Sequence, residues 1–397
     1  ISPVLIPALF LGVVLYGLFN SELPPGIEQP LKLQFFYSLM ITTMVMGKIL
    51  EKLGICNDLT ILRVVLNGIP PWRDSKLLIK DLTVDEVPLR IYQPKSPPTG
   101  KRRGILYFHG GAGTFGSIRA FERVCRCMAK KCNSVVVCVG YRLAPEHPYP
   151  GQYFDCLNAT LYFMRNLEEY HVDPGLIIIS GDSCGANFAT VICQILLNDR
   201  DLPKVRAQVL LYPGLQGLDF HLPSYQQNAF VPMLPRKLVI YFCFRYLNRK
   251  PTVLKDVLQN CHVPESMRHK YKKWVSADLI PDEFKIRGYK PLKDSPYKPE
   301  VHEAVKEILS ITFSPLLAED SIICQLPESY IVTCEFDVLR DDGLLYKKRL
   351  EDNGVQVSWY HCENGFHGIL AFFGYGIFSF LSGKRIMDNI VNYINSL

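Results

Sequence analysis

Apolar and polar positions follow a regular order from about residue 76 onward. Short apolar runs, typical of buried strands, alternate with longer stretches that suit helices. This alternation predicts the α/β class, with a mostly parallel central sheet and helices on both of its faces. Strands are expected at 77–84 and 87–94 as an antiparallel pair, then at 104–110, 134–140, 176–180, 205–213, 329–337 and 355–362. Helices are expected at about 117–131, at 153–170, from 184, at 341–353 and at the C-terminus.

Residues 215–310 interrupt this order, because they are rich in Pro, Tyr, Lys and other polar residues and contain no clear strand. An insertion of this size between two strands predicts a helical lid. With residues 20–75 it would cover the carboxyl ends of the strands, where open α/β sheets bind their ligands. The apolar stretch 35–50 is expected to be an amphipathic lid helix, which would also suit a membrane surface. The catalytic domain is then expected to occupy residues 76–397.

Residues 1–19 carry no charge and come close to the length of apolar helix that spans a bilayer. We expect a single membrane anchor rather than a cleaved signal peptide, because no clear small-x-small cleavage site follows. No Lys or Arg follows before Lys32, which favours a non-cytoplasmic catalytic domain. Asn158 begins an Asn-Ala-Thr glycosylation sequon and fits that orientation, although it falls in an expected helix.

Composition narrows the remaining function classes. Hydrophobic residues make up 48% and charged residues 21% of the chain, as in globular proteins with a large core. The net charge is +6, but the densest basic cluster is only Lys101–Arg103, so no nucleic-acid partner is expected. The 13 cysteines include no CxxC pair, so no structural metal or cofactor is expected. One or two disulfides are possible, and the odd count leaves at least one thiol free.

The segment Gly181-Asp182-Ser183-Cys184-Gly185 has the form of a nucleophile elbow. It follows the apolar run 176–180 and precedes a helical stretch, which is the context such an elbow requires. The glycines permit a tight turn that would expose the Ser183 hydroxyl in a strained conformation. The helix that follows would direct its N–H groups toward developing negative charge.

A serine hydroxyl needs a base before it can attack a carbonyl carbon. In this type of site the chain order is Ser, then Asp or Glu, then His. Only His361 and His367 follow a plausible acid. His361 lies inside the expected strand 355–362, whereas His367 lies in the loop after it, so we assign the base to His367.

Asp337 directly follows the run 331–336 at the end of an expected strand and is assigned as the acid that orients the imidazole. Asp341 and Asp342 open the next helix and are interpreted as acids that stabilise its dipole. Glu335 lies within the strand and would point elsewhere.

The tetrahedral oxyanion requires backbone N–H donors. One is expected from Cys184, which follows the nucleophile, and the others from the loop after the strand at 104–110. Gly110, Gly111 and Ala112 surround this position, with Gly111 and Ala112 as the preferred donors. His109 is interpreted as a structural residue that anchors the loop.

Taken together, these motifs resemble those of the hormone-sensitive lipase-like esterases and, within them, the arylacetamide deacetylase family. The resemblance covers nearly the whole chain. It implies a single-span protein of the endoplasmic reticulum with a lumenal α/β-hydrolase domain that hydrolyses lipophilic carboxylic esters or arylacetamides. The motifs are HGGAG at 109–113, YRLAPE at 141–146, GDSCGAN at 181–187, DVLRDDG at 337–343 and FHG at 366–368.

Two residues depart from the family pattern. Ala112 stands where the family has a third glycine, and Cys184 replaces the usual alanine after the nucleophile. If position 112 has positive φ, alanine there costs about 1 kcal/mol and could displace an oxyanion donor. The leading hypothesis is a membrane-anchored serine carboxylesterase or deacetylase. The alternatives are a weakly active or inactive binding protein for an apolar ligand, and an acyltransferase.

Overall fold

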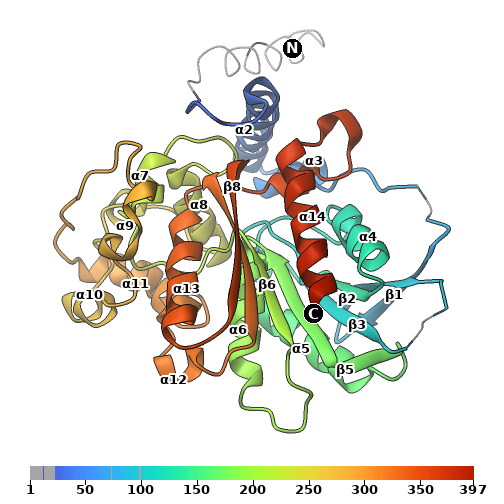
Figure 1. Ribbon diagram of the computed structural model, residues 1–397. Helices are drawn as coiled ribbons and strands as arrows, with labels where there is room; N and C mark the ends of the chain where they lie inside the picture. The colour runs from blue at the N-terminus through green and yellow to red at the C-terminus, as the bar shows by residue number, and fades with distance from the viewer. Residues whose placement is uncertain (1–11, 13–22, 73, 98–99) are drawn as a thin grey trace.

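The computed structural model describes residues 12, 23–72, 74–97 and 100–397 (Figure 1). Its centre is an eight-stranded sheet in the order β1-β2-β4-β3-β5-β6-β7-β8. The pairs β1–β2 and β2–β4 are antiparallel and the other five pairs are parallel, which confirms the expected mostly parallel sheet. The strands are β1 Leu77–Val84, β2 Val87–Pro94, β3 Arg102–Phe108, β4 Val135–Val139, β5 Val172–Asp182, β6 Ala207–Leu211, β7 Glu328–Phe336 and β8 Val357–Phe366.

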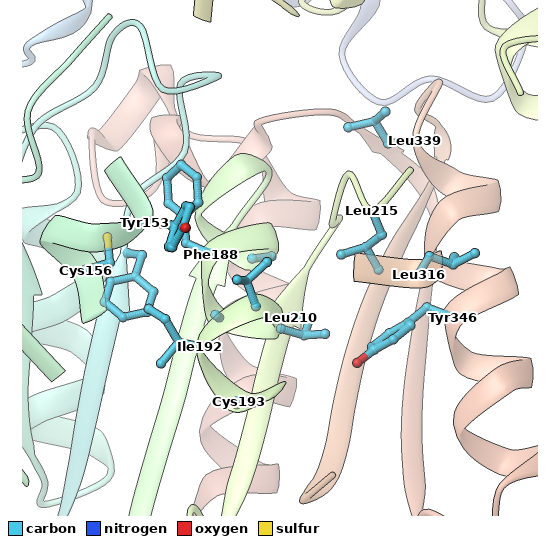
Figure 2. Close-up of a cluster of buried hydrophobic side chains, with 14 of the residues drawn as sticks. Tyr153, Cys156, Phe188, Ile192, Cys193, Leu210, Leu215, Leu316, Leu339 and Tyr346 are labelled. Atoms are coloured by element: carbon cyan, nitrogen blue, oxygen red, sulfur yellow. The ribbon is translucent and has the colours of Figure 1, made fainter. Parts of the chain in front are cut away.

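Helices cover both faces of this sheet. On one face lie α5 (Gly151–Arg165), α6 (Cys184–Leu196) and α13 (Arg340–Asp352), whose buried side chains form one large apolar core (Figure 2). On the other face lie α4 (Glu122–Lys131) and α14 (Leu381–Ser396), which form a second core. Alternate residues of β4 enter the two cores, which explains why its sequence is a continuous apolar run rather than an alternating one.

Between β6 and β7 the described chain contains helices but no strand. These helices are α7 (Pro223–Gln227), α8 (Arg236–Tyr246), α9 (Leu254–Val257), α10 (Glu265–Tyr271), α11 (Pro299–Val305) and α12 (Asp320–Ile323). Of these helices, α8 packs against two N-terminal helices, α2 (Pro30–Lys52) and α3 (Leu59–Leu66), through Met40, Leu62 and Phe242. Asp58, just before α3, pairs with Arg245 of α8 at 2.6 Å. We use the term cap for the N-terminal segment with α2 and α3 together with the segment between β6 and β7.

Several elements differ in length from the expectation. The most consequential is β8, which continues past Cys362 to Phe366, because Phe366 still pairs with Phe336 of β7 after an irregularity in the register. The strand β5 begins at Val172, where it pairs with Arg102 of β3. The helix α4 begins only at Glu122 and α5 ends at Arg165, where Asn166 caps the helix.

Residues 26–28 lie against the end of β8 and the start of α14. The amide of Asn364 donates to the Gly26 carbonyl at 3.0 Å. The Glu28 carboxylate accepts the backbone N–H groups of Leu381 and Ser382 at 2.9 and 2.8 Å. The chain segment before α2 is therefore fastened to the sheet and to α14.

The predicted anchor at 1–19 lies outside the described residues, apart from Gly12. Among those described, Pro30–Lys52 is the one helix long and apolar enough to cross a membrane, but 44% of its most apolar window is buried in the protein. All 13 cysteines are free thiols in the structure. Asn158 is exposed on α5, within the expected helix.

Candidate active site

Ser183 stands on a tight turn between β5 and α6. Its backbone has φ 55° and ψ −122°, a strained conformation for a residue with a side chain. The turn is compact because a Cβ at Gly181 would clash with the backbone of Gly185, and one at Gly185 would clash with that of Phe108. The glycines two residues before and after Ser183 are therefore required by close backbone packing.

Ser183, His367 and Asp337 form a continuous hydrogen-bonded chain. The Ser183 Oγ lies 2.8 Å from His367 Nε2, and His367 Nδ1 lies 2.8 Å from Asp337 Oδ2. Because an ionised carboxylate only accepts, Nδ1 carries the proton and Nε2 accepts the proton of the serine hydroxyl. The other Asp337 oxygen accepts the Leu339 N–H at 2.8 Å, which fixes the carboxylate in place.

His361 has a different set of partners. Its Nδ1 lies 2.9 Å from Thr333 Oγ1 and its Nε2 lies 3.2 Å from Glu335 Oε2. Burial raises the pKa of Glu335, but the bond to His361 and the charges of Arg340 and Arg287 outweigh it and lower that pKa to about 2. His361 thus belongs to an ion-pair cluster within the sheet, as its position inside a strand predicts.

The loop after β3 is fastened to the elbow by Asp182. The Asp182 Oδ1 accepts the Gly110 N–H and the Tyr107 hydroxyl, both at 2.8 Å. Burial raises the pKa of Asp182 to about 6. Gly110 lines the site as expected, but its N–H is already bonded and is not available to an oxyanion. The donors that remain from the expected set are the N–H groups of Gly111, Ala112 and Cys184.

Comparisons with known proteins agree with this geometry. A family model described as the alpha/beta hydrolase fold matches residues 105–268 and 300–371. The human protein arylacetamide deacetylase-like 4 is 39% identical over 99% of this chain and 97% of its own. Arylacetamide deacetylase-like 3 of Mus musculus is 43% identical over 97% and 94%, and arylacetamide deacetylase of Bos taurus is 38% identical over 98% and 97%.

The chain belongs to the arylacetamide deacetylase-like family.

Solved structures place the family member among esterases by fold. An esterase from Pseudomonas putida has a TM-score of 0.66 at 22% identity, covering 94% of this chain and 98% of its own. A bacterial heroin esterase has a TM-score of 0.61 at 24% identity, covering 84% and 88%. These structures share the fold of this chain. The family model and the curated relatives identify the arylacetamide deacetylase-like chain as an enzyme of the α/β-hydrolase esterase class.

The two residues that depart from the family pattern lie side by side, because Ala112 is in the loop after β3 and the Cys184 side chain contacts that loop. Ala112 has φ 53°, between Gly111 at 121° and Gly113 at 66°, so the alanine does occupy a left-handed position. The Cys184 side chain accepts the Gly113 N–H at 3.2 Å. Burial raises the pKa of the Cys184 thiol to about 12, so the sulfur remains protonated at neutral pH. A neutral thiol therefore holds the loop in its strained shape.

His109 and Arg63 support the same loop from outside. His109 Nδ1 lies 2.8 Å from the Gly110 carbonyl, and burial lowers the His109 pKa to about 4, so the imidazole is neutral. Arg63 of α3 donates to the Thr114 carbonyl at 2.8 Å and to the Ala144 carbonyl at 2.6 Å. His109 was expected to hold this loop in place, and Arg63 of the N-terminal cap segment holds it as well.

Replacing Gly111 with alanine is expected to lower kcat about 10²–10³-fold, the usual effect of losing an oxyanion donor. A Cβ at Gly111 would collide with the Phe115 carbonyl oxygen, and φ 121° is unfavourable for alanine, so the loop must shift. The matched control is Ala112→Gly, which keeps the backbone shape and should stay within a few-fold of the wild type. Equal kcat values for the two variants would contradict the prediction that the N–H groups of this loop stabilise the oxyanion.

An apolar cavity of about 410 Å³ lies above Ser183. Its walls come from the sheet loops and from both parts of the cap, so the two distant cap segments enclose one space. This size suits a small organic ligand. Its apolar lining includes Phe36, Leu39, Val65, Ile69, Phe121, Phe188, Phe220, Phe242, Phe313 and Phe372.

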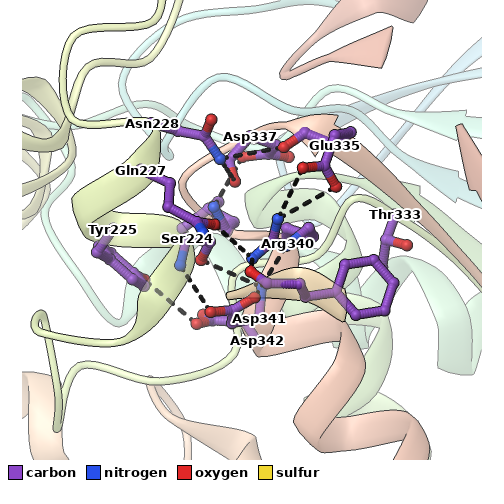
Figure 3. Close-up of polar contacts among 12 residues, drawn as sticks. Ser224, Tyr225, Gln227, Asn228, Thr333, Glu335, Asp337, Arg340, Asp341 and Asp342 are labelled. Atoms are coloured by element: carbon purple, nitrogen blue, oxygen red, sulfur yellow. Dashed lines mark hydrogen bonds and ion pairs between the residues drawn. The ribbon is translucent and has the colours of Figure 1, made fainter. Parts of the chain in front are cut away.

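A buried polar network lies beside Asp337 and joins the cap to α13 (Figure 3). Arg340, which is fully buried, donates to Asp341 at 2.9 Å and to both oxygens of Glu335 at 3.1 Å. Asp341 also accepts the Ser224 N–H at 2.7 Å, and the Asn228 amide donates to the Asp337 carbonyl at 2.9 Å. Asp341 and Asp342 do lie at the start of α13, but they also hold cap segments, which the sequence did not indicate.

Asp342 accepts the Leu215 N–H at 2.8 Å, and burial raises its pKa from 3.8 to about 7. Between these values the folded protein binds a proton that the unfolded chain has lost. Stability from this group is therefore present at low pH and is lost as the pH rises toward 7. We expect Asp342→Asn to remove a slope of up to about 1.4 kcal/mol per pH unit in this window. Urea unfolding of both proteins at several pH values measures the pH dependence of the free energy of unfolding. Identical slopes for the two proteins would contradict the prediction.

Among the described residues, one group of side chains is compact enough to be considered for a metal ion: Asp219, His221 and Asp294 in the cap. The Asn260 amide already donates to both carboxylates at 2.8 Å, and Arg268 pairs with Asp294 at 2.9 Å. These partners balance the carboxylates, so we interpret the group as a joint between two cap segments.

Proposed function

We propose that this chain is a membrane-anchored serine carboxylesterase or deacetylase that hydrolyses lipophilic esters or amides through an acyl-enzyme on Ser183. The observation that carries the proposal is the hydrogen-bonded chain Ser183–His367–Asp337 at the base of an apolar cavity. A nucleophile, a base and an acid in contact in this way are the requirements of acyl transfer.

The reaction follows from the positions of these groups. Ser183 Oγ attacks the carbonyl carbon while His367 Nε2 takes the hydroxyl proton, and Asp337 stabilises the imidazolium that forms. The N–H groups of Gly111, Ala112 and Cys184 stabilise the oxyanion. His367 then gives its proton to the leaving alcohol or amine. Water, deprotonated by the same nitrogen, releases the acid and restores the serine.

The remaining expectations complete the proposal. Residues 1–19 serve as a single-pass anchor in the endoplasmic reticulum membrane, residues 20–75 and about 215–310 serve as lids, and residues 76–397 hold the lumenal catalytic domain. Relatives named arylacetamide deacetylase support an amide or ester substrate. The exposure of Asn158 supports its use as a glycan acceptor.

A fluorophosphonate probe tests the proposal, because it phosphonylates a serine only when a base activates it. We expect covalent labelling of the folded chain, mapped by mass spectrometry to the peptide that contains Ser183, and no labelling after heat denaturation. A panel of esters with increasing acyl length should then show turnover that favours apolar acyl groups. A folded protein that binds such esters but neither labels nor turns over would support the binding-protein alternative instead.

A further inference from the structure

Large apolar side chains are unusually exposed on three segments of the described chain. These segments are α2 with the turn after it, α3 with the residues that follow it, and the loop before α14 with the first residue of that helix. Trp72 is 95% exposed, which leaves almost the whole indole in contact with solvent. We call this set the apolar rim: Leu31, Phe35, Val45, Met46, Ile49, Leu53, Ile55, Val64, Val65, Ile69, Trp72, Ile377, Phe378 and Leu381.

The three segments form one continuous surface. Lys32 of α2 donates to the Ser379 carbonyl at 3.0 Å, and the rings of Phe36 and Phe378 lie 5.9 Å apart. A Cβ at Gly68, after α3, would meet the Tyr375 hydroxyl. Figure 1 shows α2 and α3 at the same end of the molecule, above the sheet. These contacts therefore bring α2, the residues after α3 and the loop before α14 together at one end of the fold.

The rim is also the outer edge of the substrate cavity. Val65, Ile69 and Phe378 belong to the rim and line the cavity as well, and Phe36 and Leu39 continue the apolar lining inward from α2. An apolar molecule can thus pass from this surface to Ser183 without leaving an apolar environment.

The charges on these segments suit an anionic surface. The carboxylates of Glu28, Glu51 and Asp74 pair with Arg385, Arg245 and Lys130. Lys48 and Lys52 are exposed, and neither forms an ion pair with another described residue; Lys48 only stacks over the Tyr241 ring. The free positive charge next to the rim favours anionic lipid headgroups.

We propose that the apolar rim lies in one leaflet of a lipid bilayer, so that substrates dissolved among the acyl chains enter the cavity from the membrane. This proposal rests on the proposed function and names the phase that supplies its substrate. Soluble proteins rarely expose a contiguous apolar patch of this kind. Residues 1–19, expected to be a membrane anchor, precede α2 by only a short segment, which brings a bilayer rather than a soluble partner to this end.

The helix α2 is a surface element in this arrangement and not a second span. Its side chains Leu33, Met40 and Met44 are buried in the protein, and its Phe36 faces the cavity. A spanning orientation would pull these residues out of the fold. Exposed indole rings such as Trp72 favour the headgroup boundary of a bilayer.

Tryptophan fluorescence of the full chain tests where the rim lies. The chain is reconstituted into phosphatidylcholine–phosphatidylserine vesicles with or without bromine on the acyl chains, and Trp72→Phe serves as the reference for Trp274 and Trp359. We expect brominated lipid to quench the emission that the wild type has in excess of Trp72→Phe. If brominated lipid did not quench this excess emission, the proposal would be overturned. It would also be overturned if protection of Trp72 from solvent depended on protein concentration, because that would indicate contact with a second copy of the chain.

Steady-state kinetics with two esters separates the entry of substrate from the membrane from the hydrolysis step itself. Ile377→Asp is compared with Ile286→Asp, because the two residues are 80% and 81% exposed but only Ile377 belongs to the rim. We expect Ile377→Asp to raise KM for a long-chain ester dissolved in vesicles about tenfold and to leave a water-soluble acetate ester unchanged, with no effect of Ile286→Asp. Unchanged vesicle kinetics would overturn the proposal. No turnover of either ester by the wild type would instead reject the proposed function.

Discussion

Ser183→Ala is expected to lower kcat for ester hydrolysis about 10⁶-fold and to abolish fluorophosphonate labelling. The hydroxyl that His367 activates at 2.8 Å is the only group the proposal allows to form the acyl-enzyme. Nucleophile removal in serine hydrolases has an effect of this size, and the remaining rate comes from the oxyanion donors and from binding. Steady-state hydrolysis of a chromogenic short-chain ester measures the loss.

The matched control is Ser180→Ala on β5, the strand that leads to Ser183. The Ser180 hydroxyl is buried and donates to the Val209 carbonyl at 2.9 Å, away from the triad. This variant should retain kcat within a few-fold of the wild type and should still be labelled. If Ser183→Ala kept more than a small fraction of the activity, another residue would have to be the nucleophile.

Arg340→Leu is expected to lower the free energy of unfolding by about 3–5 kcal/mol, the usual cost of removing one partner of a buried ion pair. Arg340 is inaccessible to solvent and neutralises Asp341 and Glu335. Glu335 keeps Arg287 and His361, but Asp341 would be left as a buried, uncompensated carboxylate. Urea unfolding under reducing conditions measures the change.

Lys348→Met provides the comparison, because it also removes an ion pair but on the exposed face of α13. Its partner Asp352 lies 2.9 Å away, and the loss should be below about 0.5 kcal/mol. A loss for Arg340→Leu as small as that for Lys348→Met would show that the network in Figure 3 contributes little to stability.

The residues of the candidate triad could be selected from sequence because each one comes within a few residues of the end of an expected strand. The carboxyl ends of parallel strands meet at one edge of a sheet, so Ser183, Asp337 and His367 were expected to converge, and the structure brings them into hydrogen-bonding contact. The same reasoning separated His361 from His367, because a residue inside a strand is fixed by its neighbours in the sheet.

Contacts between distant segments could not be read from the sequence in this way. The bond from the Gly110 N–H to Asp182 depends on two loops of different strands meeting, and nothing local to either residue indicates it. The extension of β8 to Phe366 depends on pairing with β7. Most cap helices between β6 and β7 are short, and α9 and α12 have only 4 residues each, so tertiary packing rather than helical periodicity determines them.

The attachment of residues 26–28 and of Arg63 bears on how much of the chain is needed for an active protein. Truncation before the first strand would remove the partners of Asn364 and Ser382 near His367, and would release the Thr114 and Ala144 carbonyls from Arg63. We therefore expect a chain truncated before β1 to be less stable than the full chain. For the same reason, we expect a shortened chain that is soluble and active to retain residues from about Gly26 onward.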